Sequence, residues 1–125
     1  MIEENENLKN WEGSIFNAIK DVADIDSQKK TWLGKDPHYI SSFSEVINIL
    51  YDDFDFEQYV KYYEQVKGKD ALYILFSELD EKINEYDASG KTDEQILEDP
   101  PWIEITQKAK EISRMLDNRT SLLSS

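Results

Sequence analysis

Residues 50–66, LYDDFDFEQYVKYYEQV, hold the densest group of side chains that could do chemistry. Five carboxylates lie among six aromatic rings in this stretch, and Lys61 is its only cation. The carboxylates are Asp52, Asp53, Asp55, Glu57 and Glu64. Such a stretch could bind a metal ion, supply a pair of catalytic carboxylates, or form a surface that meets a basic partner.

A calcium loop of the EF-hand type requires oxygen ligands at alternating positions, glycine at the sixth position and glutamate at the twelfth. If the loop began at Asp53, Glu64 would stand at the twelfth position, but Gln58 would stand where glycine makes the sharp turn. Bulky Phe54 and Phe56 also separate the carboxylates. The sequence therefore predicts no metal site, and we interpret the carboxylates as a helix break that faces solvent.

The residue types give little support for catalysis. A glycoside hydrolase needs two carboxyl groups across a cleft, and among 27 acidic residues some pair always has a suitable separation. His38 is the only histidine, so a serine nucleophile would need it as the base, and no G-x-S-x-G turn is present. Motifs for binding nucleotide phosphates or a protease zinc ion are also missing. We predict a protein without catalytic residues or cofactors; a small hydrolase that uses His38 is the enzymatic alternative.

The formal net charge of −13 indicates which partners the chain can bind. Residues 36–99 carry 17 acidic and 5 basic side chains, so the acidity lies in the middle of the sequence. Such a field repels nucleic acid and anionic membranes, and it accelerates encounter with a basic protein. Lys108, Lys110 and Arg114 are too few to make a nucleic-acid-binding face against this charge. Solubility alone is the other explanation of the acidity.

The expected compartment follows from features that the sequence lacks. Cysteine is absent, which excludes disulfides and thiolate metal sites and is typical of a reducing compartment. The acidic, polar start MIEENENLKNWEG lacks the features of a secretion signal, and no apolar run is long enough to span a membrane. We therefore expect a cytoplasmic protein that does not bind membranes.

Hydrophobic periodicity predicts helices along most of the chain. Residues 3–23 place Trp11, Ile15, Ile19 and Val22 at three- and four-residue steps. Residues 24–42 lose this period and collect Asp, Ser, Gly and Pro, which indicates a long loop. Further helices are predicted from their apolar stripes over residues 43–50, 56–66, 71–86 and 101–116, with a short helix between residues 92 and 98.

Particular residues predict where these helices begin and end. Ser41 or Ser42 can cap the helix that begins at residue 43, and Glu45 stands three residues after Ser42, the spacing of a capping box. Thr92 and Gln95 have the same spacing. Asp53 or Asp55 can cap the helix that begins at residue 56. Gly68 can adopt the left-handed conformation that ends this helix.

We predict an all-α fold, a compact bundle of four to five main helices with one long loop near residues 24–42. We expect residues 1–125 to form a single domain, in which residues 1–8 and 119–125 are loose. A mixed fold with a short hairpin between Trp32 and Ile40 is the alternative.

Two predicted helix faces outside the core are rich in acidic side chains. On the helix over residues 56–66, Tyr62 falls beside the core stripe, and on the next helix Glu78, Glu81 and Glu85 share one face. If the two helices are neighbours, one acidic patch results, and two separate solvated faces are the alternative. The predicted partner-binding residues are Asp52, Asp53, Asp55, Glu57, Tyr62, Glu78, Glu81 and Glu85.

Residues 31–60, TWLGKDPHYISSFSEVINILYDDFDFEQYV, resemble the central part of small immunity proteins from bacterial contact-dependent growth inhibition systems. The similar features are the Trp–Gly–Pro loop, the helix start ISSFSE and the DDFD that follows it. The resemblance implies a cytoplasmic, non-enzymatic protein that binds and neutralises the toxin domain of a cognate effector, often a basic nuclease. It implies no catalytic residue. The alternative is an acidic adaptor or regulatory protein that binds a basic partner without any toxin.

Overall fold

The computed structural model describes residues 2–35 and 41–117, with side chains from Leu8 onward. This part of the chain contains seven α-helices, one π-helical segment and no strand, so the predicted all-α bundle is confirmed. The elements are α1 (Ile2–Ala23), α2 (Ile25–Thr31), α3 (Phe43–Asn48), η1 (Ile49–Asp53), α4 (Phe56–Lys67), α5 (Ala71–Glu85), α6 (Asp93–Glu98) and α7 (Pro100–Asp117).

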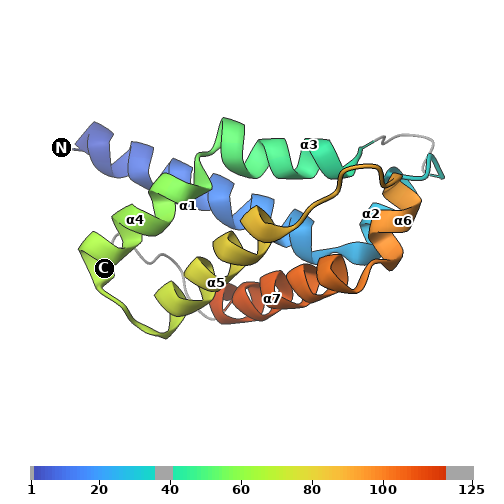
Figure 1. The fold of residues 1–125 in the computed structure, drawn as a ribbon. Helices are drawn as coiled ribbons and strands as arrows, with labels where there is room; N and C mark the ends of the chain where they lie inside the picture. Colours follow the sequence, from blue (N-terminus) through green and yellow to red (C-terminus); the bar gives the residue numbers. More distant parts are fainter. Residues whose placement is uncertain (1, 36–40, 118–125) are drawn as a thin grey trace.

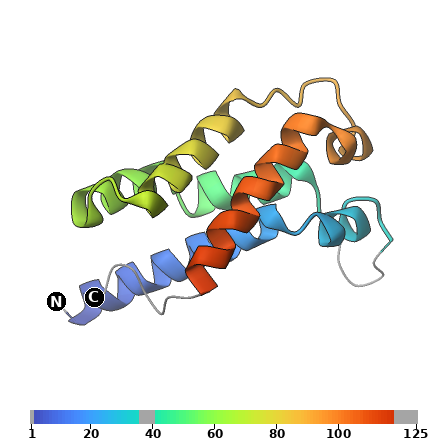
Figure 2. The same ribbon diagram turned by 90° about the horizontal axis from the view of Figure 1, so that it is seen from below.

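Helices α1 and α7 form the central antiparallel pair of the bundle, and their contact is the most extensive between any two elements (Figure 1). Helix α5 packs against α7 and also contacts α4, while α3 and η1 contact α1 (Figure 2). The short helices α2 and α6 contact each other at one end of the bundle. Within residues 2–35 and 41–117, no helix combines the length and the apolar character that crossing a membrane requires.

The first of two aromatic clusters joins α1, α4 and α5. Phe76 of α5 makes edge-to-face contacts with Tyr59 and Tyr63 of α4, at ring-centroid distances of 5.6 and 5.3 Å. Trp11 of α1 meets Tyr59 edge-on at 5.4 Å. All three of Phe76, Tyr59 and Tyr63 are fully buried, as their positions on the predicted core stripes require. This cluster holds the α4–α5 pair against the first half of α1.

The second aromatic cluster surrounds Trp102, which is fully buried near the start of α7. The ring centroids of Phe43, Trp32 and Tyr86 lie 5.2, 5.8 and 6.0 Å from that of Trp102. These three rings belong to α3, to the end of α2 and to the end of α5. Each such aromatic pair contributes about 0.5–1.5 kcal/mol beyond the burial of its area. One side chain therefore joins four segments that are distant in sequence.

The long loop expected at residues 24–42 is interrupted by helix α2. The Asp24 carboxylate caps this helix, because it accepts a hydrogen bond from the Ser27 amide at 3.0 Å. The alternative mixed fold placed a short hairpin between Trp32 and Ile40. Trp32 has right-handed helical backbone angles, so this residue is not in an extended strand. His38 and the rest of residues 36–40 lie outside the described residues.

Gln28 of α2 is buried although it is polar. Its amide nitrogen donates hydrogen bonds to the backbone carbonyls of Asp21 and Val22, both at 2.9 Å. Its amide oxygen accepts a hydrogen bond from Trp102 Nε1 at 3.1 Å. The position of α2 thus depends on a helix cap and on one buried polar side chain, neither of which produces an apolar period in the sequence. This explains why periodicity indicated a loop.

Most predicted helix ends are confirmed. The Ser42 hydroxyl accepts from the Glu45 amide, and Thr92 forms both hydrogen bonds of a capping box with Gln95. Gly68 ends α4 as predicted and has a positive φ of 76°, but its ψ of −167° lies outside the left-handed helical conformation that the cap prediction named. Several ends differ from the predicted ranges by one residue: α4 ends at Lys67, α5 ends at Glu85, α7 spans Pro100–Asp117 and α1 begins at Ile2. That residues 1–8 are loose stays a prediction. Residues 119–125 lie outside the described residues.

We expect Gln28→Met to lower the free energy of unfolding by about 3 kcal/mol, because it leaves Trp102 Nε1 and the Val22 carbonyl without their partner and removes one of the two hydrogen bonds to the Asp21 carbonyl. Urea unfolding followed by tryptophan fluorescence measures this change. The control is Gln65→Met, the same substitution at an exposed position of α4. Equal stability of the two variants would show that the Gln28 hydrogen bonds do not hold α2 in place.

Candidate partner-binding surface

The acidic DDFD stretch forms a helix break with an unusual backbone. Helix α3 continues into the π-helical segment η1, whose wider turn is closed by the Phe54 amide donating to the Ile49 carbonyl at 3.1 Å. Trp11 Nε1 of α1 donates to the Phe54 carbonyl at 2.6 Å. The break is therefore fixed to the first half of α1 by a direct hydrogen bond. π-Helical turns often lie at functional sites, where they reorient neighbouring side chains.

Asp55 occupies the residue before α4, as the cap prediction required, but its side chain makes no capping hydrogen bond. Its φ of 53° makes it the single non-glycine residue with positive φ in the described part of the chain. Aspartate enters this left-handed region more readily than most residues, although at an energetic cost. The conformation turns the chain sharply between η1 and α4. Asp52, Asp53 and Asp55 all remain exposed, and none forms an ion pair within the described residues.

Tyr51 anchors the same break to α5. Its hydroxyl donates to the Asp80 carboxylate at 2.7 Å, and its ring meets Phe56 edge-on at 5.8 Å. Burial raises the pKa of the Tyr51 hydroxyl, and the hydrogen bond and charge of Asp80 raise it further. The hydroxyl therefore stays protonated as a donor. The carboxylates of the break project from a backbone that is held from two sides, by α1 and by α5.

The remaining predicted residues of α4 have contacts of their own. Tyr62 is half-buried against Trp11, with their ring centroids 5.9 Å apart. Glu57 is exposed and lies 3.8 Å from Lys61 of the same helix. Such an exposed pair contributes about 0–1 kcal/mol, so Glu57 can exchange Lys61 for another cation at little cost. We call Asp52, Asp53, Asp55, Glu57 and Tyr62 the break surface.

The predicted residues of α5 divide between solvent and the neighbouring helix α7. Glu81 and Glu85 are exposed, whereas Glu78 is half-buried and lies 3.4 Å from Lys108 of α7. Tyr62 contacts α1, and Glu78 contacts α7. The eight predicted residues lie on two segments, residues 52–62 and α5, and α4 and α5 pack against each other, as the single-patch prediction required. That they form one acidic patch and that they bind a partner stay predictions.

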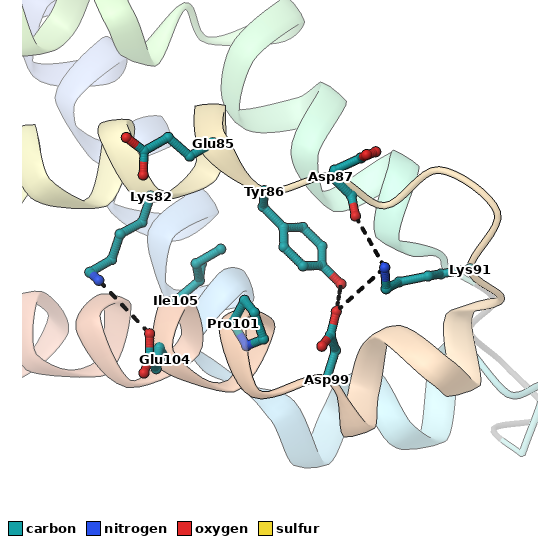
Figure 3. A pocket seen from close by; sticks show the side chains of 9 residues that line it. All are labelled: Lys82, Glu85, Tyr86, Asp87, Lys91, Asp99, Pro101, Glu104 and Ile105. Carbon is teal, nitrogen blue, oxygen red and sulfur yellow. Dashed lines mark hydrogen bonds and ion pairs between the residues drawn. The ribbon is translucent and has the colours of Figure 1, made fainter.

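A cleft of about 370 Å³ lies where the end of α5 approaches the start of α7 (Figure 3). We call it the Tyr86 cleft. The residues that line it are Lys82, Glu85, Tyr86, Asp87, Lys91, Asp99, Pro101, Glu104 and Ile105. Glu85 is the one member that belongs to the predicted set. A second hollow, of about 300 Å³, shares Lys82 and Glu104 with the cleft and continues along α7 to Glu111.

The polar groups of the Tyr86 cleft are connected to one another. The Tyr86 hydroxyl donates to Asp99 at 2.8 Å, and Lys91 Nζ lies 4.0 Å from the same carboxylate. On the opposite side, Lys82 Nζ lies 4.0 Å from Glu104 (Figure 3). Burial raises the pKa of the Tyr86 hydroxyl, and the Asp99 hydrogen bond adds to this, so the hydroxyl remains a donor.

Sequence reasoning did not find this cleft, because its walls come from residues 82–91 and 99–105, which meet through tertiary packing alone. Asp99 and Pro101 carried a signal for a helix boundary but none for a cavity. Trp11 was predicted as a core residue, and its hydrogen bond to the break had no sequence signal. In the described part of the chain, no three His, Cys, Asp or Glu side chains are arranged to hold a metal ion.

Comparisons with known proteins identify no relative: no protein-family model, no curated protein and no solved structure matches the chain.

The strain at Asp55 can be measured separately from its charge. We expect Asp55→Gly to be more stable than Asp55→Ala by about 1 kcal/mol, because glycine adopts the left-handed conformation without a side-chain clash and alanine does not. Both variants lose the carboxylate, so the alanine variant is the matched control. Urea unfolding of the two variants gives the difference. Equal stability would show that the left-handed turn imposes no strain in solution.

Proposed function

We propose that this chain is a non-enzymatic immunity protein that binds and neutralises a basic toxin domain, with a nuclease as the first candidate. The observation that carries the proposal is the break surface, where three exposed aspartates lie together without a cation partner among the described residues. The resemblance of residues 31–60 to contact-dependent growth inhibition immunity proteins supports the same function.

The charge of the chain fits an inhibitor that must find its target quickly. A nuclease exposes a cationic surface to the phosphates of its substrate, and a protein with a net charge of −13 is attracted to such a surface. Steering of this kind raises association rates, while affinity depends more on buried anchors. Tyr62 offers aromatic area, half-buried beside Trp11, whose indole N–H is hydrogen-bonded to the Phe54 carbonyl of the break. The inhibitor would block the active site of the toxin or a surface beside it.

The rigidity of the break surface also favours binding. A carboxylate on a fixed backbone loses less conformational freedom on association than one on a mobile loop. The hydrogen bonds from Trp11 to the Phe54 carbonyl and from Tyr51 to Asp80 fix the backbone on both sides of Asp52 and Asp53. The acidic surface is therefore organised before a partner arrives.

The test requires a large effector gene beside the gene for this chain, and the C-terminal domain of that effector is the partner to be purified. We expect the triple variant Asp52→Asn, Asp53→Asn, Asp55→Asn to associate about tenfold more slowly with that domain, because steering depends on local charge. Surface plasmon resonance at several salt concentrations measures the rate. As ionic strength rises, the association rate of the unmodified chain should fall towards that of the triple variant.

The matched control removes the same three charges elsewhere. Asp26→Asn, Glu94→Gln and Glu98→Gln change exposed side chains on α2 and α6, outside the break surface. The control should retain most of the association rate. Equal slowing of both triple variants would show that net charge acts without a defined surface. Absence of any complex with the effector domain would contradict the immunity function.

A further inference from the structure

The Tyr86 cleft has the shape and chemistry to receive one long cationic side chain. Its floor is made by Pro101 and Ile105, and the Tyr86 ring forms one wall between them and α5 (Figure 3). The aliphatic stems of arginine and lysine cover apolar surface of this kind while their charged ends remain at a polar rim. The volume of about 370 Å³ exceeds what a single water molecule needs by an order of magnitude.

The rim of the cleft has more carboxylates than cations. Glu85, Asp87, Asp99 and Glu104 line the cleft together with Lys82 and Lys91, which leaves two formal negative charges in excess. The Asp87 carboxylate itself accepts a hydrogen bond from the Ser89 amide at 2.9 Å. Both lysine ammonium groups lie 4.0 Å from their nearest carboxylates, at the outer limit of an ion pair. Glu85 forms no ion pair within the described residues, and its side chain is exposed. The carboxylates therefore retain capacity for a further cation.

The ends of α5 and α7 at the cleft have opposite effects on the electrostatic potential there. Helix α5 ends at Glu85, so its last carbonyls place the negative end of the helix dipole here. Helix α7 begins at Pro100 and brings a positive end, which the neighbouring Asp99 carboxylate offsets. Two positions in the first turn of α7 are prolines, which have no N–H group to offer an anion. The balance favours a cation over an anion.

We infer that the Tyr86 cleft binds one arginine side chain of the basic partner, with the stem on Tyr86 and Pro101. The guanidinium takes the place of Lys82, whose side chain lies between Glu85 and Glu104 (Figure 3). Arginine fits better than lysine because its planar, weakly hydrated guanidinium can contact two carboxylates at once. A neutral side chain would leave Glu85 without a partner, and an anion would be repelled. The source of the arginine rests on the proposed function, whereas the binding chemistry of the cleft does not.

The test uses the full chain and a small probe, so it does not depend on any toxin. The ligands are Nα-acetyl-arginine methylamide and its citrulline counterpart, which has a similar shape and no charge. Both are titrated into the isotope-labelled protein, and amide chemical shifts are followed by NMR. We expect the arginine probe to shift the amides of Glu85, Tyr86 and Glu104, with an affinity about tenfold higher than that of citrulline.

Variants decide whether the shifts come from the cleft or from diffuse charge. Glu85→Gln should weaken the arginine probe by about three- to tenfold. Glu94→Gln removes one charge from α6 outside the cleft and should leave its affinity unchanged. The inference is wrong if citrulline binds equally well. It is also wrong if the arginine shifts are spread over the acidic surface or are unaffected by Glu85→Gln.

The result of the NMR titration does not depend on the binding experiment with the effector domain. Probe binding at the cleft without any complex with the effector domain would reject the immunity function and keep the arginine site. A complex whose association depends on the break surface, without probe binding at the cleft, would reject the arginine site and keep the immunity function.

Discussion

The hydrogen bond between Trp102 Nε1 and the buried Gln28 side chain is the constraint on which much of the structure depends. Trp102 lies at the centre of the ring cluster that joins α3, α7 and the ends of α2 and α5. A buried indole N–H without an acceptor costs about 1–3 kcal/mol, and the Gln28 side chain removes this cost at Trp102. Gln28 supplies it and also satisfies two carbonyls at the end of α1. Tyr86 also contacts the Trp102 ring. The position of the Tyr86 wall of the cleft therefore depends on the hydrogen bond between Trp102 and Gln28 as well.

The strongly periodic parts of the fold could be predicted from the sequence. Leu72, Phe76, Leu79 and Ile83 repeat at helical spacing and are all buried on α5. Helix α2 could not be predicted in this way, because it is short and is held by the Asp24 cap and by Gln28 rather than by an apolar stripe. The DDFD break was predicted at the correct place, but its backbone was not. The π-turn and the left-handed Asp55 occur where Trp11 and Tyr51 make tertiary hydrogen bonds, and no local sequence pattern indicates those contacts.

The candidate surface shows the same division between local and tertiary information. Helical spacing correctly indicated that Glu81 and Glu85 are exposed and that Tyr62 lies beside the core stripe. Spacing within one helix says nothing of which neighbour each face meets, so the contacts of Glu78 with Lys108 and of Tyr62 with Trp11 were not foreseen. The resulting molecule has a rigid acidic break near α1 and an acidic cleft at the end of α5. In our account these are two sites at which a basic partner can be engaged.

Hydrogen–deuterium exchange of the full chain, with and without the C-terminal effector domain, tests this account most directly. It reports where a partner covers the backbone without requiring any substitution. The account predicts slower exchange on binding over residues 49–62, which include η1 and the first half of α4, and over residues 82–87 at the end of α5. Protection confined to other helices, such as α2 and α6, would contradict the claim that the acidic break and the neighbouring cleft bind the partner.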